Sequence, residues 1–278
     1  MNESQIAIGW ALSFVQAHDA DLNEALKRLQ KKPRAAAPVH AVRRSLARFK
    51  ATLEDFGSCL PLPDLYDLVA ELHKRSGKIR DADVLLERVE AYFECAEPGE
   101  CDELVALHGE LRSLRKTASK RLRRALRRND RRPRTIKGRI VPIDTDLGTN
   151  EAIYRIVTVR TAETFAASRD FVRDGERLHA FRLATKRLRF ALDRFFLALP
   201  QFSESSEYLE SLGDELGLAR DLLLLEQLAA DRKMHALIPR VAADRTAAIE
   251  RARLLWVAAV GARGPLEALI GYAGFGVA

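Results

Sequence analysis

The sequence predicts an all-α protein, for three reasons. Apolar side chains recur every three or four positions along most of the 278 residues, which is the period of a helix packed on one face. β-Branched runs with strict alternation, which would indicate strands, are almost absent; residues 153–159 form one β-branched cluster, and it fits a helix equally well. Residues that interrupt helices, such as Pro38, Pro98 and Pro200, fall between the periodic segments.

These breaks divide the chain into two sets of predicted helices. The first set covers residues 3–29, 39–56, 63–76, 79–96 and 101–128. The second set covers residues 150–173, 177–198, 203–216, 218–231 and 234–260. We predict a single domain over residues 1–278, made of repeat 1 (about 3–128), a linker rich in proline and glycine (about 129–149) and repeat 2 (about 150–265).

The two sets are copies of one pattern. His179 lies 139 residues after His40 (179 minus 40), and each histidine opens a helix in which Arg or Lys recurs at helical spacing. Further on, SGKIRDADV from Ser76 matches LGLARDLLL from Leu216 at an offset of 140 (216 minus 76). We interpret the chain as a tandem duplication of a five-helix unit. The halves are expected to pack about a pseudo-two-fold axis, because one repeat cannot bury both of its faces alone.

The charge is segregated along the chain. Lys and Arg number 46 against 39 Asp and Glu, for a net charge of +7, so the distribution of charge matters more than its total. Many acids gather between Glu54 and Glu110, whereas residues 112–139 are overwhelmingly basic.

On a helical wheel, each histidine helix has a cationic front and an apolar back. The backs are Val42, Phe49, Leu53 and Phe56 in the first copy and Phe181, Ala184, Leu188, Ala191, Leu192 and Phe195 in the second. The predicted anion-binding residues are His40, Arg43, Arg44, Arg48 and Lys50, and then His179, Arg182, Lys186, Arg187 and Arg189. We expect the second copy to contribute more, because its row of cations is more complete.

A third cationic row follows the predicted helix 101–128. Its members lie about one turn apart, at a spacing of about 5–6 Å that a flexible chain of phosphates could follow. They are Arg112, Lys116, Lys120, Arg123 and Arg127, opposite an apolar seam of Leu104, Leu107, Leu111, Leu114, Ala118, Leu122 and Ala125. A weaker counterpart in the second half comprises Arg245, Arg251 and Arg253. Lys78, Arg80 and Arg220, in the segments that follow the histidine helices, complete the predicted anion-binding set.

A more ordinary interpretation of each feature stays open. Basic helix faces usually only keep the helix solvated, and a single histidine is most often structural. Asp81 and Asp221 suit the first turn of a helix, where the macrodipole favours a carboxylate. Two features weigh against mere solvation of the rows. Carboxylates at i+4 are missing from their first turns, and the row is duplicated at matching positions.

Other classes of protein are not indicated. The sequence lacks a phosphate-cradling Gly-rich loop, a GxSxG or CxxC motif and paired histidines, so we expect no enzyme activity, no cofactor and no metal. Cys59, Cys95 and Cys101 have neither a disulfide framework nor zinc-ligand spacing, which favours a cytoplasmic location. No signal peptide or membrane span is expected.

The repeated pattern resembles the CHAD family, the conserved histidine α-helical domain. The motifs that carry the resemblance are HAFRLATKRLR from His179, HAVRRSLARFK from His40 and the Gly-x-x-Arg-Asp segment that follows each. The first copy differs from the family pattern at Ala47, where the family has a cation, and at Lys50, where it has arginine.

The resemblance implies two pseudo-symmetric helical bundles whose basic helices line a central cavity or pore. It also implies binding of inorganic polyphosphate and association with polyphosphate granules, by a stand-alone CHAD protein. The first alternative is an RNA- or DNA-binding protein, which the 7% aromatic content disfavours, since single-strand binders stack bases on aromatic rings. A second alternative is a metal-assisted phosphoanhydride enzyme that uses Asp81, Asp83 and Asp221.

Overall fold

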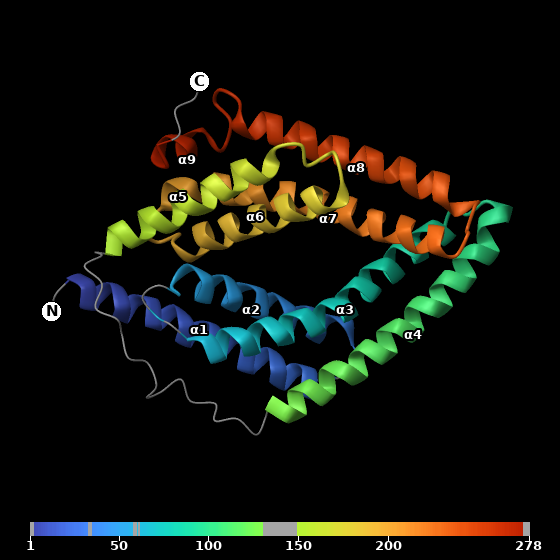
Figure 1. The fold of residues 1–278 in the computed structure, drawn as a ribbon, viewed down its shortest axis with the longest axis horizontal. Helices are drawn as coiled ribbons and strands as arrows, with labels where there is room; N and C mark the ends of the chain where they lie inside the picture. The colour runs from blue at the N-terminus through green and yellow to red at the C-terminus, as the bar shows by residue number, and fades with distance from the viewer. Residues whose placement is uncertain (1–2, 33–34, 58–59, 61, 130–148, 275–278) are drawn as a thin grey trace. The chain divides into compact units, whose positions relative to one another are not determined.

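The computed structural model describes residues 3–32, 35–57, 60, 62–129 and 149–274, and all of their regular structure is helical (Figure 1). The predicted all-α class is confirmed. The chain divides into two compact units, unit 1 (residues 1–149) and unit 2 (residues 150–278). The predicted linker falls almost wholly on 130–148, which lies outside the described residues. Pseudo-symmetry and the central cavity stay predictions.

In unit 1 the residues that the structure describes form four long helices in sequence order. They are α1 (Glu3–Lys31), α2 (Ala36–Asp55), α3 (Pro63–Phe93) and α4 (Pro98–Asn129), and each packs against the next. Between α1 and the end of α2, the rings of Phe14 and Phe56 are stacked at 6.2 Å, and Trp10 meets Phe14 edge-on at 4.8 Å. These aromatic contacts bury the apolar side of α1 against α2.

Unit 2 repeats this order and adds short elements. Its helices are α5 (Thr149–Ser168), α6 (Gly175–Arg194), the 3₁₀ turn η1 (Pro200–Phe202), α7 (Ser203–Asp231), α8 (Leu237–Val260) and α9 (Glu267–Tyr272). Helix α7 packs against both α6 and α8. Phe181 of α6 lies at the centre of the core, with its ring 4.7 Å from Phe171 and 5.0 Å from Trp256 of α8.

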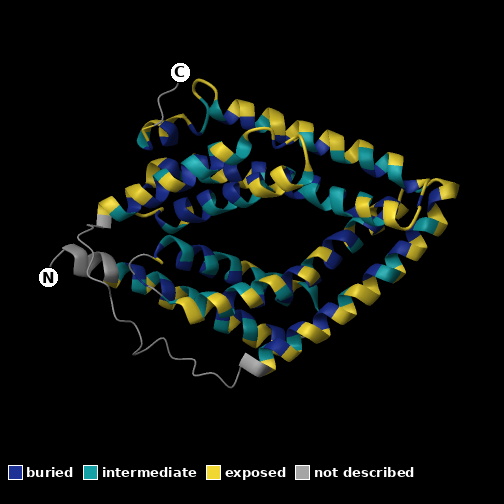
Figure 2. Ribbon diagram, in the orientation of Figure 1, coloured by how far each residue is buried: buried dark blue, intermediate teal, exposed yellow. Residues whose placement is uncertain are grey.

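The predicted apolar backs are confirmed as core. Every back residue of α2 and α6 is buried, and Phe49, Phe181 and Leu188 are fully inaccessible to solvent. Figure 2 shows buried and exposed residues alternating along the helices of both units, as expected of helices that pack on one side. Burial of one such side chain contributes about 1.5–3 kcal/mol, so these positions hold the two helices in a fixed rotation. The cationic fronts therefore have a defined direction. None of the described helices is apolar over a long enough stretch to cross a membrane.

The apolar seam of α4 is confirmed except at Leu114, which is 48% exposed. The other six seam residues are buried. At this turn the side chain directed toward α3 is the next one, Arg115, which contacts Asp83. An ion pair between the helices therefore takes the place that the periodicity assigned to leucine.

The predicted breaks after residues 76 and 216 are wrong, because α3 and α7 run through them without interruption. The described residues of each unit thus form four long helices rather than five, and Asp81 and Asp221 lie in mid-helix rather than in a first turn. A single glycine inside a helix costs only about 1 kcal/mol relative to alanine. Gly77 and Gly217 each leave space for an arginine side chain of the preceding long helix. A Cβ at Gly77 would lie 2.8 Å from Arg43 Nη1, and one at Gly217 would lie 3.5 Å from Arg182 Nε.

Candidate anion-binding site

A buried apolar back fixes the direction of the cationic row in both α2 and α6, but the two helices begin differently. The start of α6 is fixed by Asp174, whose side chain accepts a hydrogen bond from the backbone N–H of Arg177 at 2.8 Å. At the equivalent position of α2 the N-cap is Ala35, which makes no such bond. Behind both rows lie the buried backs, so Lys50 and Lys186 are held half-buried on the front of their helices.

The last cation of each row has a carboxylate partner. Lys50 Nζ lies 2.8 Å from Glu54 Oε1, four residues further along α2. At the equivalent place in α6, Arg189 lies 3.6 Å from Asp193 and 2.8 Å from Glu210 of α7. Lys50 and Arg189 were both predicted to bind an anion. A polyanion that binds either cation has to compete with its carboxylate partner.

The carboxylates of these pairs are themselves held at matching positions. Tyr66 on α3 donates its hydroxyl to Glu54 at 3.1 Å, and Ser206 on α7 donates to Asp193 at 2.5 Å. Tyr66 and Ser206 are 140 residues apart (206 minus 66), as are the two glycines of the third helices. The duplication therefore extends to hydrogen bonds that the sequence pattern did not indicate.

Arg43 joins α2 to α3. Its Nη1 donates to the backbone carbonyl of His73 at 3.1 Å, and the guanidinium passes over Gly77. The same carbonyl accepts the hydroxyl of Ser76 at 2.9 Å. Arg43 was predicted to bind an anion, but the structure directs one of its donors into the interface between two helices.

His40 belongs to a polar cluster that connects three helices of unit 1. Arg80 Nη1 on α3 lies 2.8 Å from His40 Nε2, so this ring nitrogen is the acceptor. His40 Nε2 also lies 3.4 Å from Asp83 Oδ2, and Asp83 accepts a hydrogen bond from Arg115 of α4. Arg80 further lies 3.5 Å from Glu87.

The surroundings of His40 favour its neutral form. Burial lowers the pKa of His40 from 6.5 most strongly, and the positive charge of Arg80 lowers it further. Asp83 and Glu87 raise the pKa, but by less. A neutral imidazole is the form that can accept the hydrogen bond from Arg80, so His40 helps to hold that arginine in place.

Unit 2 lacks the buried carboxylate of this cluster. Leu223 occupies the position equivalent to Asp83 (223 minus 83 gives the repeat offset of 140). His179 is exposed where His40 is half-buried, and Arg220 makes no ion pair with any residue that the structure describes. The equivalent Arg80 contacts both His40 and Glu87.

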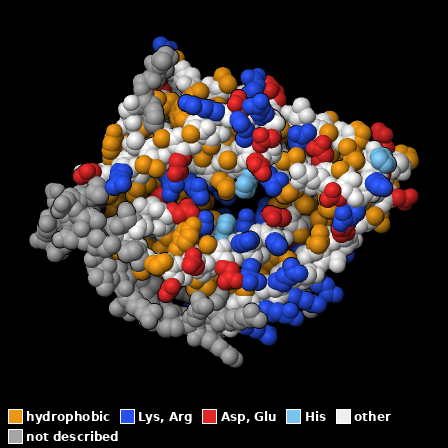
Figure 3. All heavy atoms as spheres, in the orientation of Figure 1, with side chains coloured by type: hydrophobic (Ala, Val, Ile, Leu, Met, Phe, Trp, Pro, Cys, Tyr) orange, Lys and Arg blue, Asp and Glu red, His pale blue; other side chains and the backbone are white. Residues whose placement is uncertain are grey.

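The third predicted row lies on the outer face of α4. Its first three members and Arg127 are exposed, while Arg123 is half-buried and donates from Nε to the carbonyl of Ser119 at 3.4 Å. Residues 111–129 contain no Asp or Glu. None of the five cations forms an ion pair within the described part of the chain. Lys and Arg side chains gather over the second half of α4 (Figure 3).

The weaker counterpart on α8 is neutralised. Arg245 lies 2.6 Å from Glu226, Arg251 lies 3.0 Å from Glu215, and Arg253 lies 2.6 Å from Glu250. Two of these acids belong to α7, so the pairs also join α7 to α8. The two fourth helices therefore present opposite electrostatic environments.

The remaining predicted residues differ in exposure. Arg44 and Lys78 are exposed, and neither forms an ion pair with a described residue. Arg48, Arg182 and Arg187 are half-buried. Of the predicted set, the structure brings His40 and Arg80 into direct contact.

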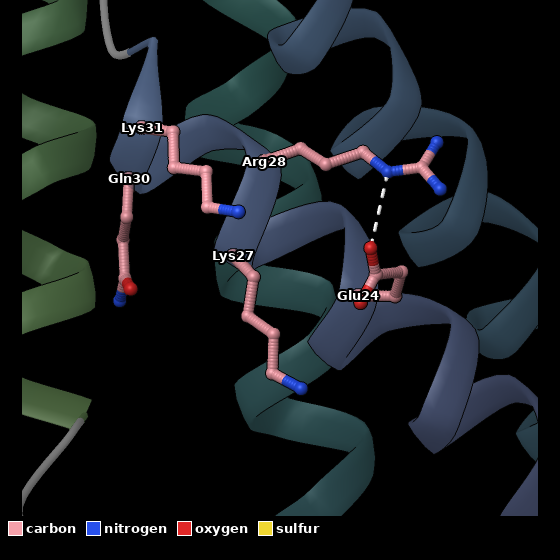
Figure 4. A pocket seen from close by; sticks show the side chains of 5 residues that line it. All are labelled: Glu24, Lys27, Arg28, Gln30 and Lys31. Atoms are coloured by element: carbon pink, nitrogen blue, oxygen red, sulfur yellow. Dashed lines mark hydrogen bonds and ion pairs between the residues drawn. The ribbon is translucent and has the colours of Figure 1, made fainter.

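Sequence reasoning missed a separate cationic surface at the end of α1. A hollow there is lined by Glu24, Lys27, Arg28, Gln30 and Lys31, and Arg28 donates to Glu24 at 3.2 Å (Figure 4). The pair Lys27 and Lys31, at i and i+4, was the available sequence signal. Arg115 was missed as well, because its partner Asp83 is on another helix.

No metal site is apparent in the residues that the structure describes: no three His, Cys, Asp or Glu side chains converge there. Asp83, which the enzyme alternative assigned to a metal, is 5% exposed and contacts Arg115 and His40. Cys95 and Cys101 are exposed free thiols, and Cys59 lies outside the described residues.

Comparison with known proteins finds a family model that matches part of the chain. The family model of the CHAD domain matches residues 16–137, which include most of α1 and all of α2, α3 and α4. Over these residues the chain is similar to the CHAD domain family. No curated protein matches the chain.

Solved structures share the CHAD fold over almost the whole chain. PptA from Streptomyces chartreusis is similar with a TM-score of 0.67 and 19% identity, over 90% of this chain and 97% of that one. The CHAD domain from the plant Ricinus communis is similar with a TM-score of 0.56 and 21% identity, over 94% and 91%. At this identity the likeness concerns the fold, which extends through unit 2.

Proposed function

We propose that this protein binds inorganic polyphosphate without cleaving it and associates with polyphosphate granules in the cytoplasm. The observation that carries the proposal is the row on α4: five cations over four turns, with no acidic residue from 111 to 129. A helix rises 1.5 Å per residue, so the row from Arg112 to Arg127 is about 22 Å long. A linear polyanion can follow such a row.

The chemistry of the row suits phosphate. Arginine offers forked donors to phosphate oxygens, and lysine supplies a mobile point charge. Like charges at i and i+4 destabilise a helix by a few tenths of a kcal/mol per pair, and a bound anion offsets this repulsion. The α2 and α6 rows add cations whose direction is fixed by the core behind them.

Burial of the aromatic side chains favours polyphosphate over single-stranded RNA or DNA. Single-strand binders stack bases on exposed rings. Phe49 of α2 and Phe181 of α6 are fully buried, and Phe190 of α6 is 9% exposed. The phenylalanines within these two helices therefore offer no exposed ring for stacking, which suits a polyanion that has no bases.

The proposal is tested by titrating fluorescently labelled polyphosphate at several salt concentrations. Each phosphate contacted is expected to contribute about −0.7 to the log–log slope of affinity against salt, if single-stranded nucleic acid is a fair guide. We expect a slope of about −3 or steeper from the α4 row alone. Affinity that is weak and independent of salt contradicts the proposal.

Two controls separate the alternatives. Unlabelled RNA at equal phosphate concentration should displace polyphosphate poorly, and displacement at parity supports the nucleic-acid alternative. Polyphosphate incubated with the protein and Mg²⁺ should keep its length on a gel. Shortening of the polymer supports the phosphoanhydride enzyme.

A further inference from the structure

One ring nitrogen of His40 has both a hydrogen-bond donor and a hydrogen-bond acceptor close to it. Arg80 Nη1 lies 2.8 Å from His40 Nε2, and Asp83 Oδ2 lies 3.4 Å from the same atom. Arg80 Nη1 is 3.3 Å from the other ring nitrogen, so the shorter distance identifies Nε2 as the acceptor. A nitrogen with a lone pair can accept from Arg80 but cannot donate to Asp83, and a protonated nitrogen does the reverse. The proton on Nε2 therefore decides which residue His40 bonds.

Asp83 offers the acceptor that a protonated His40 needs. Its side chain is 5% exposed, and Oδ2 is buried and receives no hydrogen bond in the part of the chain that the structure describes. The other oxygen, Oδ1, accepts from Arg115 of α4. A buried polar atom without a hydrogen bond is uncommon, because its desolvation is not compensated. A proton on His40 Nε2 gives Oδ2 its donor.

Arg80 loses an acceptor in the same event. The neutral ring accepts its hydrogen bond, whereas an imidazolium has only donors and carries a like charge. Arg80 Nη1 also lies 3.5 Å from Glu87, whose side chain is 58% exposed. Ion pairs with exposed carboxylates are weak. After protonation, a polyanion thus competes for Arg80 with this exposed pair instead of with a hydrogen bond to a half-buried ring.

The charges around His40 set the pH of this exchange. The titratable and charged groups around the first turns of α2 are His73, Arg80, Asp83 and Glu87 of α3, Arg115 of α4, Arg43 and Arg44 of α2 itself, and Lys27, Arg28 and Lys31 of α1, which ends just before α2 begins. Burial lowers the pKa of His40 below 6.5, Arg80 lowers it further, and Asp83 and Glu87 raise it by less. The ring is therefore neutral above pH 6.5 and becomes protonated below it.

We infer that His40 is a positioning residue for Arg80, and that protonation of its ring exchanges Arg80 for Asp83 as its partner. The neutral ring holds Arg80 against α2. The protonated ring donates to Asp83, and Arg80 becomes a contact for polyphosphate. Binding through unit 1 is thus sensitive to pH at one arginine. This inference rests on the proposed function.

The change of partner is tested first without a ligand, in ¹H–¹⁵N spectra of the imidazole rings. The signals of His40 are those that disappear in His40→Gln. We expect Nε2 to be unprotonated at about pH 7.5 and to gain its proton only below about pH 6.5. A neutral ring that carries its proton on Nε2 at about pH 7.5 can donate to Asp83 without any change of pH, and this result overturns the inference.

The consequence for binding is tested by titrating labelled polyphosphate at two pH values. Arg80→Gln should lower affinity less than about twofold at about pH 7.5 and about fivefold at about pH 5.5, as for one phosphate contact at 0.1 M salt. In a His40→Gln background its effect should be the same at both pH values, because glutamine does not titrate. Lys116→Gln is the matched control: it removes an exposed cation of α4 and should lower affinity about fivefold at both.

The outcomes separate this inference from the proposed function. Circular dichroism establishes that each variant is folded, and the comparison of wild-type protein with Arg80→Gln remains decisive if His40→Gln is not. If wild-type protein binds polyphosphate and the effect of Arg80→Gln does not grow in acid, the inference is overturned and the proposed function stands. If wild-type protein does not bind at either pH, the proposed function fails, and the spectra still decide whether His40 changes its partner.

Discussion

In unit 1 the histidine of the repeated motif lies against a buried aspartate, whereas in unit 2 the equivalent position is a leucine. Both repeats keep the same helices, the same buried backs and the same arginine over a helical glycine. Asp83 pairs with Arg115 and lies beside His40, and Glu87 lies beside Arg80, whereas the equivalent positions of unit 2 hold Leu223 and Gln227. A duplicated motif thus fixes the geometry of a cationic face without fixing how much of its charge is available to a ligand.

The fourth helices, α4 and α8, differ in how many of their cations are paired with carboxylates. The arginines of α8 are paired with Glu215, Glu226 and Glu250, whereas the outer row of α4 has no acidic neighbour in its own sequence from 111 to 129. Unit 1 therefore carries on α4 a cationic row whose counterpart on α8 is paired with carboxylates.

The largest expected effect comes from comparing the two fourth helices. Lys116→Gln with Lys120→Gln removes two exposed cations of α4, and should lower polyphosphate affinity about 25-fold at 0.1 M salt, as for the loss of two phosphate contacts. Arg251→Gln with Arg253→Gln removes the same charge from α8, where carboxylates already neutralise it. That control should lose less than about threefold. Equal losses in a fluorescence titration would show that pairing with acids does not decide which helix binds.

A smaller effect is expected on stability, from the two helical glycines. At Gly217 an added methyl group makes an ordinary contact at 3.5 Å, so Gly217→Ala should raise the free energy of unfolding by about 0.5–1 kcal/mol through helix propensity. At Gly77 the methyl group would lie 2.8 Å from Arg43 Nη1 and displace its hydrogen bond to His73. A bond to a charged donor contributes about 1.5–3 kcal/mol, so Gly77→Ala should destabilise by about 1 kcal/mol.

Urea denaturation measures these differences, with Gly109→Ala as a control because nothing lies within 4 Å of its added methyl group. That variant should be stabilised like Gly217→Ala. In an Arg43→Ala background the effect of Gly77→Ala should change sign, since the obstructing guanidinium is gone. Stabilisation by Gly77→Ala in the wild-type background is the result that refutes a tight contact between Arg43 and α3.

The helices and their core faces were predictable because both depend on local periodicity. Phe49 and Phe181 were placed in the core from spacing alone, and both are fully buried. Leu114 was the exception in α4, since a charged neighbour, Arg115, replaced it at the interface. The two breaks assigned to Gly77 and Gly217 were wrong, because a glycine that provides space for an arginine has the same sequence signal as one that ends a helix.

The contacts within the candidate site were less predictable. The ion pair of Asp83 with Arg115 joins residues 32 positions apart on different helices, and neither belongs to the repeated pattern. Arg189 was expected to be open to a ligand, yet Glu210 of the next helix lies 2.8 Å away. Charge periodicity along one helix shows which side faces outward. The acids that a neighbouring helix brings to that side depend on how the helices pack.

The most direct test of this account compares one arginine at equivalent positions of the two repeats. Arg220→Gln should lower polyphosphate affinity about fivefold at 0.1 M salt and reduce the salt slope by about 0.7, because Arg220 has no intramolecular carboxylate partner among the described residues. Arg80→Gln should change affinity less than about twofold, because Arg80 is already bonded to His40 and lies near Glu87. Equal losses from the two variants, or a larger loss from Arg80→Gln, would contradict the claim that the repeats share a geometry but differ in available charge.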